Sequence, residues 1–198
     1  MKRITVFCGA NSGVHPSYMK AASALGKLMA EQNIGLVYGG ASVGLMGAIA
    51  DAVISAGGHV IGVMPQHLVD REIAHQGLTD LRIVNTMHER KALMIELSDG
   101  FIAMPGGFGT LDEFCEVLTW SNIGLHQKPT GLLNINEYFV PLLQLFELSL
   151  KEEFIRPDQH KRVLHDTDPS CLIQKFQTHW TLSTSVRKNN FTLKTKNI

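Results

Sequence analysis

Two patterns of apolar and polar residues alternate along this chain. Short, nearly continuous apolar runs are each followed by a longer stretch with apolar residues at helical spacing. The short runs predict buried strands, and the longer stretches predict helices. The predicted strands are Ile4–Cys8, Leu36–Tyr38, Val60–Met64, Leu81–Val84, Phe101–Met104 and Thr130–Leu133, and the predicted helices are Pro16–Glu31, Leu45–Ala56, Met87–Leu97, Thr110–Ile123 and Tyr138–Leu150.

This alternation predicts an α/β fold, a Rossmann-like doubly wound parallel sheet with helices on both faces. We expect one domain over residues 1–185 and a mobile basic tail over residues 186–198, which hold basic side chains and no acid. Ligands of such folds bind outside the carboxyl ends of the strands, where the strand order reverses. Glycine clusters follow three predicted strands there, at Gly9–Gly13, Gly39–Gly47 and Gly106–Gly109.

Composition narrows the class of protein. The chain has 198 residues, of which 44% are hydrophobic, which suits one substantial core. Lys and Arg together number 18, as do Asp and Glu, so charge gives no reason to propose nucleic acid or a membrane as partner. The three cysteines are far apart, which indicates reduced thiols in the cytoplasm. No apolar stretch approaches the ~20 residues that cross a bilayer, and the first apolar run is too short for a signal peptide.

The segment Pro105-Gly-Gly-Phe-Gly-Thr-Leu-Asp-Glu113 is the most informative motif. Glycine N–H groups beside a helix N-terminus form an anion site, usually for phosphate. The alternative is a capping box formed by Thr110 and Glu113, the commoner meaning of such spacing. A cap does not need three glycines, so the loop favours a ligand. Asp112 and Glu113 would then lie in the first helical turn, where one of them must face ribose or a developing cation.

A second charged motif, Met87-His-Glu-Arg-Lys91, opens a predicted helix. A solvated charged face is the simpler explanation. Arg90 and Lys91 point about 100° apart, so both reach one ligand only at a helix end. An arginine can hold phosphate through two parallel hydrogen bonds.

Familiar nucleotide and hydrolase motifs are absent from the sequence. Leu45 stands where a P-loop has lysine, and the first turn lacks G-x-G-x-x-G, which disfavours NAD. Gly44 and Gly47 could serve either close helix packing or ligand approach, and both alternatives remain open. The histidines lack metal-ligand spacing and no G-x-S-x-G is present, so we expect no metal, no cofactor and no serine hydrolase.

Together the P-G-G-x-G-T-x-x-E and M-H-x-R-K motifs resemble those of the LOG ("Lonely guy") family, once labelled "possible lysine decarboxylase". The resemblance runs from about Ile4 to Ile155 and includes Tyr38-Gly-Gly and Gly44-Leu-Met-Gly47. These proteins are cytokinin riboside 5′-monophosphate phosphoribohydrolases. The resemblance implies hydrolysis of a purine riboside 5′-monophosphate, either AMP or a cytokinin riboside 5′-monophosphate, to free base and ribose 5-phosphate. It also implies a homodimer, and the cysteines have already indicated a cytoplasmic protein.

The resemblance also implies residue roles. Glu113 and Arg90 would be catalytic, with Glu113 stabilising an oxocarbenium-like ribose or orienting water. Ala41 and Ala74-His-Gln-Gly77 depart from the family pattern, and the second departure leaves open whether the base is adenine or a cytokinin. The implied substrate contacts are Glu72, Arg90, Lys91, Gly106, Gly107, Phe108, Gly109, Thr110 and Thr119.

Two other functions are weighed against this one. A non-catalytic nucleotide-binding or sensing module could have the same fold. Lysine decarboxylation is disfavoured, because it normally needs a pyridoxal phosphate lysine and nothing marks Lys91 as one.

A two-fold dimer is expected to bury part of helices 87–97 and 110–123, because the apolar residues of the second helix span more than one face.

Overall fold

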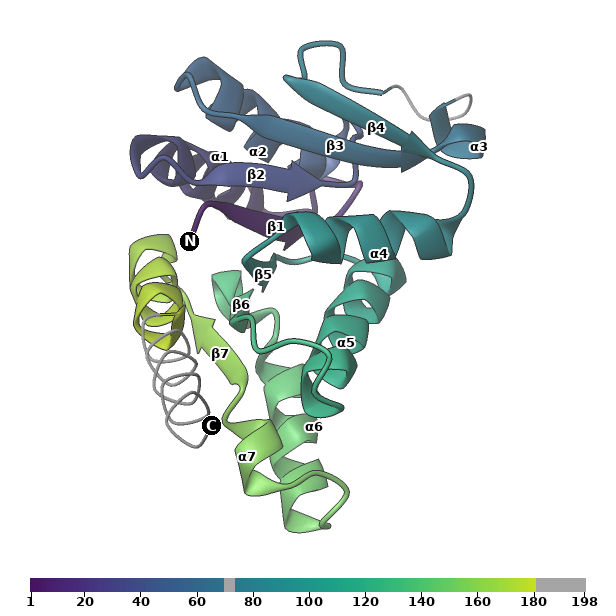
Figure 1. Cartoon of the computed structure of the whole chain (residues 1–198). Coiled ribbons are helices and arrows are strands. Elements are labelled where there is room, and N and C mark those ends of the chain that lie inside the picture. The colour runs from purple at the N-terminus through teal and green to yellow at the C-terminus, as the bar shows by residue number, and fades with distance from the viewer. Residues whose placement is uncertain (70–73, 181–198) are drawn as a thin grey trace, which may run out of the picture.

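The computed structural model describes residues 1–69 and 74–180. Within them, seven parallel strands form one sheet in the order β4-β3-β2-β1-β5-β6-β7 (Figure 1). Short apolar segments form the central strands because both of their faces are covered. The strands are β1 (Arg3–Phe7), β2 (Gly35–Tyr38), β3 (Val60–Pro65), β4 (Asp80–Val84), β5 (Gly100–Ala103), β6 (Thr130–Leu133) and β7 (Val163–Asp166).

Helices cover both faces of the sheet. Helices α1 and α2 and the helical residues 169–180 pack into one core, and α4, α5 and α6 pack into the other. The helices are α1 (Ser17–Glu31), α2 (Gly44–Ser55), α3 (Gln66–Val69), α4 (Met87–Leu97), α5 (Phe108–Asn122), α6 (Val140–Lys151) and α7 (Pro157–His160), with a 3₁₀ turn η1 (Ile135–Glu137).

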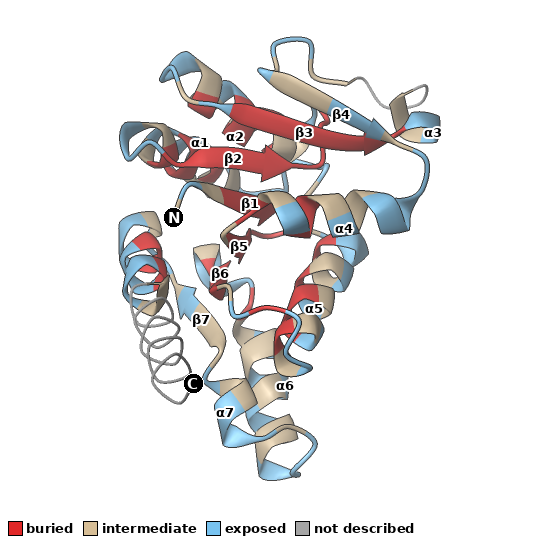
Figure 2. Ribbon diagram, viewed as in Figure 1, coloured by how far each residue is buried: buried red, intermediate tan, exposed pale blue. Residues whose placement is uncertain are grey.

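Strand β1 shows how the two cores form. Ile4 and Val6 face the core with α1 and α2, whereas Phe7 faces the core with α4 and α5. Ile4 pairs with Leu36 of β2 on one side and Gly100 of β5 on the other. Apart from Arg3, the residues of the five central strands are buried. Figure 2 shows this burial in red along β2 and β3, whereas the edge strands β4 and β7 are only partly covered.

The strand order reverses beside β1. Strands β2 to β4 extend the sheet on one side of β1, and β5 to β7 extend it on the other. After β1 the chain continues to α1 on one face of the sheet, and after β5 it continues to α5 on the other face. The loops that begin these connections lie at the carboxyl edge of the sheet, which is where ligands bind in doubly wound proteins. The predicted Rossmann-like fold is confirmed.

Every predicted strand and helix is present, with ends within two residues of those expected. Strand β7 was not predicted, because the edge segment Val163–Asp166 contains His165 and Asp166 and lacks an apolar run. Glu72 and the predicted tail 186–198 lie outside the described residues. Among the residues that the structure describes, no helix is long and apolar enough to span a bilayer.

Candidate active site

Two glycine loops meet at the point where the strand order reverses. The N–H of Gly9, after β1, donates to the carbonyl of Pro105, after β5, at 3.1 Å. A cavity of about 320 Å³ opens beside this contact. Its walls come from the loop after β1, the end of β2, helix α4 and the first two turns of α5.

The glycine loop before α5 leaves the start of that helix open. The first bond within α5 runs from the Leu111 N–H to the Gly107 carbonyl at 3.2 Å, so the N–H groups of Phe108, Gly109 and Thr110 have no acceptor in the helix. A Cβ at Gly107 or Gly109 would meet no atom within 4 Å, and neither glycine has a positive φ. Neither packing nor conformation requires glycine here, which favours ligand approach.

The capping box that was the alternative to a ligand loop does not form, and the predicted helix start at Thr110 is two residues late. Helix α5 begins at Phe108 with Gly107 as its N-cap, and no side chain caps it. Thr110 is instead the third helical residue, buried beside Gly106, where a Cβ would collide with the Thr110 hydroxyl. The earlier start moves Asp112 and Glu113 out of the first turn, where sequence analysis had placed them, and into the second.

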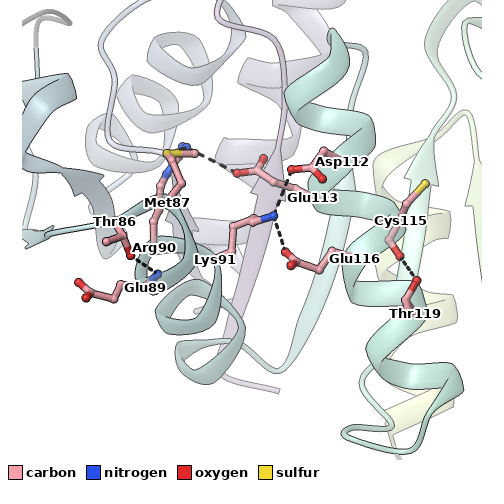
Figure 3. A network of polar contacts seen from close by, with 10 residues as sticks. All are labelled: Thr86, Met87, Glu89, Arg90, Lys91, Asp112, Glu113, Cys115, Glu116 and Thr119. Carbon is pink, nitrogen blue, oxygen red and sulfur yellow. Dashed lines mark hydrogen bonds and ion pairs between the residues drawn. The ribbon is translucent and has the colours of Figure 1, made fainter.

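An ion pair between α4 and α5 faces the cavity. Arg90 Nη1 lies 3.7 Å from Glu113 Oε1, and each side chain is only 12% exposed (Figure 3). Arg90 Nε donates to the carbonyl of Val63 in β3, at 3.1 Å. This hydrogen bond holds the guanidinium in place, and its Nη groups remain beside the cavity.

The environment of Glu113 perturbs its carboxyl group. Burial raises the pKa of Glu113 above its ordinary value, and the attraction of Arg90 offsets only part of that effect. A carboxylate with a raised pKa is a better proton acceptor than one in water. Glu113 therefore has the placement and the basicity of a general base or of an electrostatic partner for a cation.

Lys91 points away from Arg90, as expected for neighbours on a helix. Its Nζ lies 3.2 Å from Asp112 Oδ2 and 3.1 Å from Glu116 Oε2, both on α5 (Figure 3). Lys91 does not line the cavity of Arg90 and Glu113. In this chain it joins α4 to α5 and neutralises acids near the site.

The structure does not bring every predicted contact into the cavity. Arg90, Gly107, Gly109, Thr110 and Glu113 line it, whereas Lys91, Phe108, Gly106 and Thr119 do not. The Phe108 side chain is almost fully exposed, at 92%. Thr119 is exposed, and its hydroxyl donates to the carbonyl of Cys115 at 2.8 Å.

Sequence analysis missed several residues that line the cavity. Asn11 and Gly39 could have been found, because both lie in glycine clusters that follow strands. Met87 opens the charged motif, and Asp112 was treated only as a neighbour of Glu113. No sequence pattern marked Cys8 as a residue of the cavity. Burial raises the pKa of its thiol well above the ordinary range, and the charge of Glu113 adds to this effect.

The glycine cluster after β2 combines two roles. A Cβ at Gly44 or Gly47 would collide with backbone atoms, so packing explains these two positions. Gly39 differs, because a Cβ there would collide with Nη2 of Arg90. Its missing side chain makes room for the guanidinium, so Gly39 belongs to the site.

A second cavity of about 250 Å³ adjoins the first. Both cavities are lined by Gly9 and Gly107, and the second also by Gly106, Tyr18 and Tyr138. The glycine loops thus form a shared wall between two spaces. A change in the backbone of these glycine loops would therefore alter the contacts of a ligand bound against them.

A doubly wound sheet, an open helix N-terminus and an Arg–Glu pair at the reversal point define a nucleotide-binding α/β protein. Comparison with known proteins makes the class more specific. The model of the family described as "Possible lysine decarboxylase" matches residues 46–176, and the chain belongs to this family, the LOG family that its motifs resemble.

Relatives and solved structures agree with this placement. The chain is 52% identical over 164 residues to a cytokinin riboside 5′-monophosphate phosphoribohydrolase of Rhodococcoides fascians, covering 82% of this chain and 83% of that protein. It is 44% identical over 178 residues to one of Arabidopsis thaliana, covering 90% and 82%. The structure of the molybdenum cofactor binding protein from Rippkaea orientalis is 26% identical, with a TM-score of 0.68 over 90% of this chain and 97% of that chain.

Proposed function

We propose that this protein hydrolyses the N-glycosidic bond of a cytokinin riboside 5′-monophosphate, releasing free base and ribose 5-phosphate. The observation that carries the proposal is the Arg90–Glu113 pair, which faces the same cavity as the open N-terminus of α5. Relatives that are 43% to 52% identical are named for this activity. Within the described residues, no cluster of three or more His, Cys, Asp or Glu could hold a metal ion.

The residues suit the chemistry of glycoside hydrolysis. Departure of the base leaves an oxocarbenium-like ribose that a nearby carboxylate stabilises. We assign this role to Glu113, which can also orient the attacking water. The N–H groups that begin α5 would hold the 5′-phosphate, and Gly107 and Gly109 leave room for it. Arg90 would contact phosphate or ribose, and it keeps its charge throughout because guanidinium does not deprotonate.

The identity of the base is a finer question, and we propose that AMP is accepted beside prenylated substrates. Ala41 and Ala74, in the two segments that depart from the family pattern, form an antiparallel bridge with each other. The N–H of His75 also donates to the carbonyl of Gly40 at 3.0 Å, close to Gly39 of the cavity. The two segments that depart from the family pattern therefore lie together beside the site, where they can alter which base is accepted.

One experiment separates this enzyme from a non-catalytic nucleotide-binding module. Purified protein is incubated with AMP and with isopentenyladenosine monophosphate, and free base is measured by HPLC. Hydrolysis predicts equal amounts of base and ribose 5-phosphate, and Glu113→Gln serves as the matched inactive control. Nucleotide binding without release of base would overturn the proposal and favour the module.

We also propose a cytoplasmic homodimer. Of the apolar residues of α5, Phe114, Val117 and Leu118 are buried within the chain itself and cannot form the contact, whereas Trp120 is only half-buried. Exposed apolar side chains at the two ends of α5 are better candidates, namely Phe108 and Ile123. Light scattering at micromolar concentration tests the dimer, and a mass near the monomer value of 21.8 kDa would contradict it. Cell fractionation tests the compartment.

A further inference from the structure

The turn between β6 and α6 has an unusual backbone. Asn136 and Glu137 are consecutive residues with positive φ, at 51° and 59°. Residues other than glycine rarely adopt this backbone conformation. Its occurrence at two successive residues indicates that surrounding contacts impose it. Within the same turn, the buried side chain of Asn134 accepts a hydrogen bond from the N–H of Phe139 at 2.7 Å. The turn is therefore rigidly built.

This turn contacts two of the segments that border the second cavity, the glycine loop before α5 and the start of α1. The Tyr138 hydroxyl donates to the carbonyl of Gly106 at 2.6 Å, and Asn136 Nδ2 donates to the hydroxyl of Ser17 at 2.6 Å. The ring of Tyr138 meets that of Tyr18 edge-on, with centroids 6.2 Å apart. Both segments that Tyr138 touches are remote from it in sequence, and one of them is the glycine loop of the candidate active site.

The contact with Gly106 fixes the orientation of one peptide group. In a trans peptide the carbonyl and the following N–H point in opposite directions. Tyr138 holds the Gly106 carbonyl on its own side, so the Gly107 N–H points away from Tyr138. Because glycine lies on both sides of this peptide, its rotation meets little steric resistance without the hydroxyl. Gly107 lines the cavity of Arg90 and Glu113.

We infer that Tyr138 is a positioning residue for the phosphate site, an inference that rests on the proposed function. Tyr138 does not line the cavity of Arg90 and Glu113 and acts through the peptide between Gly106 and Gly107. With the hydroxyl present, that peptide offers an N–H to an anion at the start of α5. Without it, the peptide can turn its carbonyl oxygen toward the anion, which the oxygen repels.

The test measures binding of AMP and of adenosine by titration calorimetry, so it does not depend on turnover. Tyr138→Phe keeps the ring and removes the hydroxyl. We expect it to weaken AMP binding five- to tenfold, about 1–1.4 kcal/mol, while adenosine binding stays within about twofold. Tyr18→Phe is the matched control, because Tyr18 lines the same second cavity and contacts Tyr138 through its ring, which phenylalanine keeps. It should bind both ligands like the wild type.

A second measurement follows the peptide itself. Nitrogen-15 relaxation should show exchange broadening at Gly106 and Gly107 in Tyr138→Phe and not in Tyr18→Phe. Unchanged AMP binding, an equal loss of AMP and adenosine binding, or unbroadened glycine resonances would overturn the inference. If wild-type protein binds AMP but releases no base, the proposed function fails, whereas a selective loss of AMP binding in Tyr138→Phe would still support the positioning role.

Discussion

Replacement of Gly109 by alanine should raise the stability of the protein and weaken its binding of nucleotide. A Cβ at Gly109 meets no protein atom within 4 Å, and the residue lies in the first turn of α5 without a positive φ. Alanine in a helix is more stable than glycine by roughly 0.5–1 kcal/mol. For a chain of this size, 1 kcal/mol shifts Tm by about 2–4 °C, so we expect a rise of about 1–4 °C.

The same methyl group should obstruct the ligand. It would lie in the open space over the first N–H groups of α5, where we place the 5′-phosphate. A hydrogen bond to a charged group contributes about 1.5–3 kcal/mol, so disturbing one such bond should weaken AMP binding tenfold or more. Calorimetric titration of AMP and a thermal melt of the free protein measure the two effects separately.

Gly57→Ala provides the matched control. Gly57 also has no atom within 4 Å of its Cβ position, but its φ is +75°, and it lies outside the site. Forcing alanine into this left-handed conformation should destabilise the protein by about 1–2 kcal/mol and leave AMP binding unchanged. Wild-type affinity for AMP in Gly109→Ala would refute the phosphate site, and a lowered Tm in that variant would refute the open space beside it.

Further predictions concern the charged residues between α4 and α5. Glu113→Gln should remove most turnover while AMP still binds; activity within a few-fold of wild type would exclude a catalytic Glu113. AMP should exceed adenosine in kcat/KM, because remote phosphate contacts assist the reaction, and equal values would remove the phosphate argument. As pH falls, kcat/KM should decline through the pKa of Glu113, which burial raises, so the decline begins above the ordinary glutamate range; a pH–rate profile checks this. Lys91→Met should lower the free energy of unfolding by about 0.5–1 kcal/mol, because its pairs with Asp112 and Glu116 are lost. Its KM should stay within about twofold of the wild-type value. A large rise in KM at unchanged Tm would instead indicate that Lys91 contacts the substrate.

The sequence predicted the fold well for a physical reason. Central strands of a parallel sheet are buried on both faces, so segments such as Val60–Pro65 must be apolar throughout and stand out from the helices. The glycine loops after β1 and β5 could also be located, because open sheets place such loops at the strand ends. The edge strand β7 was not predicted, because strand positions that are not fully buried accept polar residues and so do not form an apolar run.

The remaining features depend on distances that a sequence does not contain. The start of α5 was misplaced because Gly107 caps the helix through its backbone, while Thr110 and Glu113 imitate a capping box at the expected spacing. The partners of Lys91 are set by the approach of α4 to α5. The bond from Tyr138 to Gly106 joins residues 32 positions apart, and no local pattern marks it.

The charge distribution explains how an anion site can exist beside several acids. Because α5 begins at Phe108, its positive end is separated by a full turn from Asp112 and Glu113. Lys91 then compensates Asp112, and Arg90 pairs with Glu113. The cavity therefore presents N–H groups and a guanidinium to an anion, and the largely buried carboxylate of Glu113 to the atom that becomes cationic, while Lys91 neutralises Asp112 at the cavity wall. Lysine could not replace Arg90 in this arrangement, because one ammonium cannot reproduce the fixed fork that bonds the Val63 carbonyl and pairs with Glu113 at the same time.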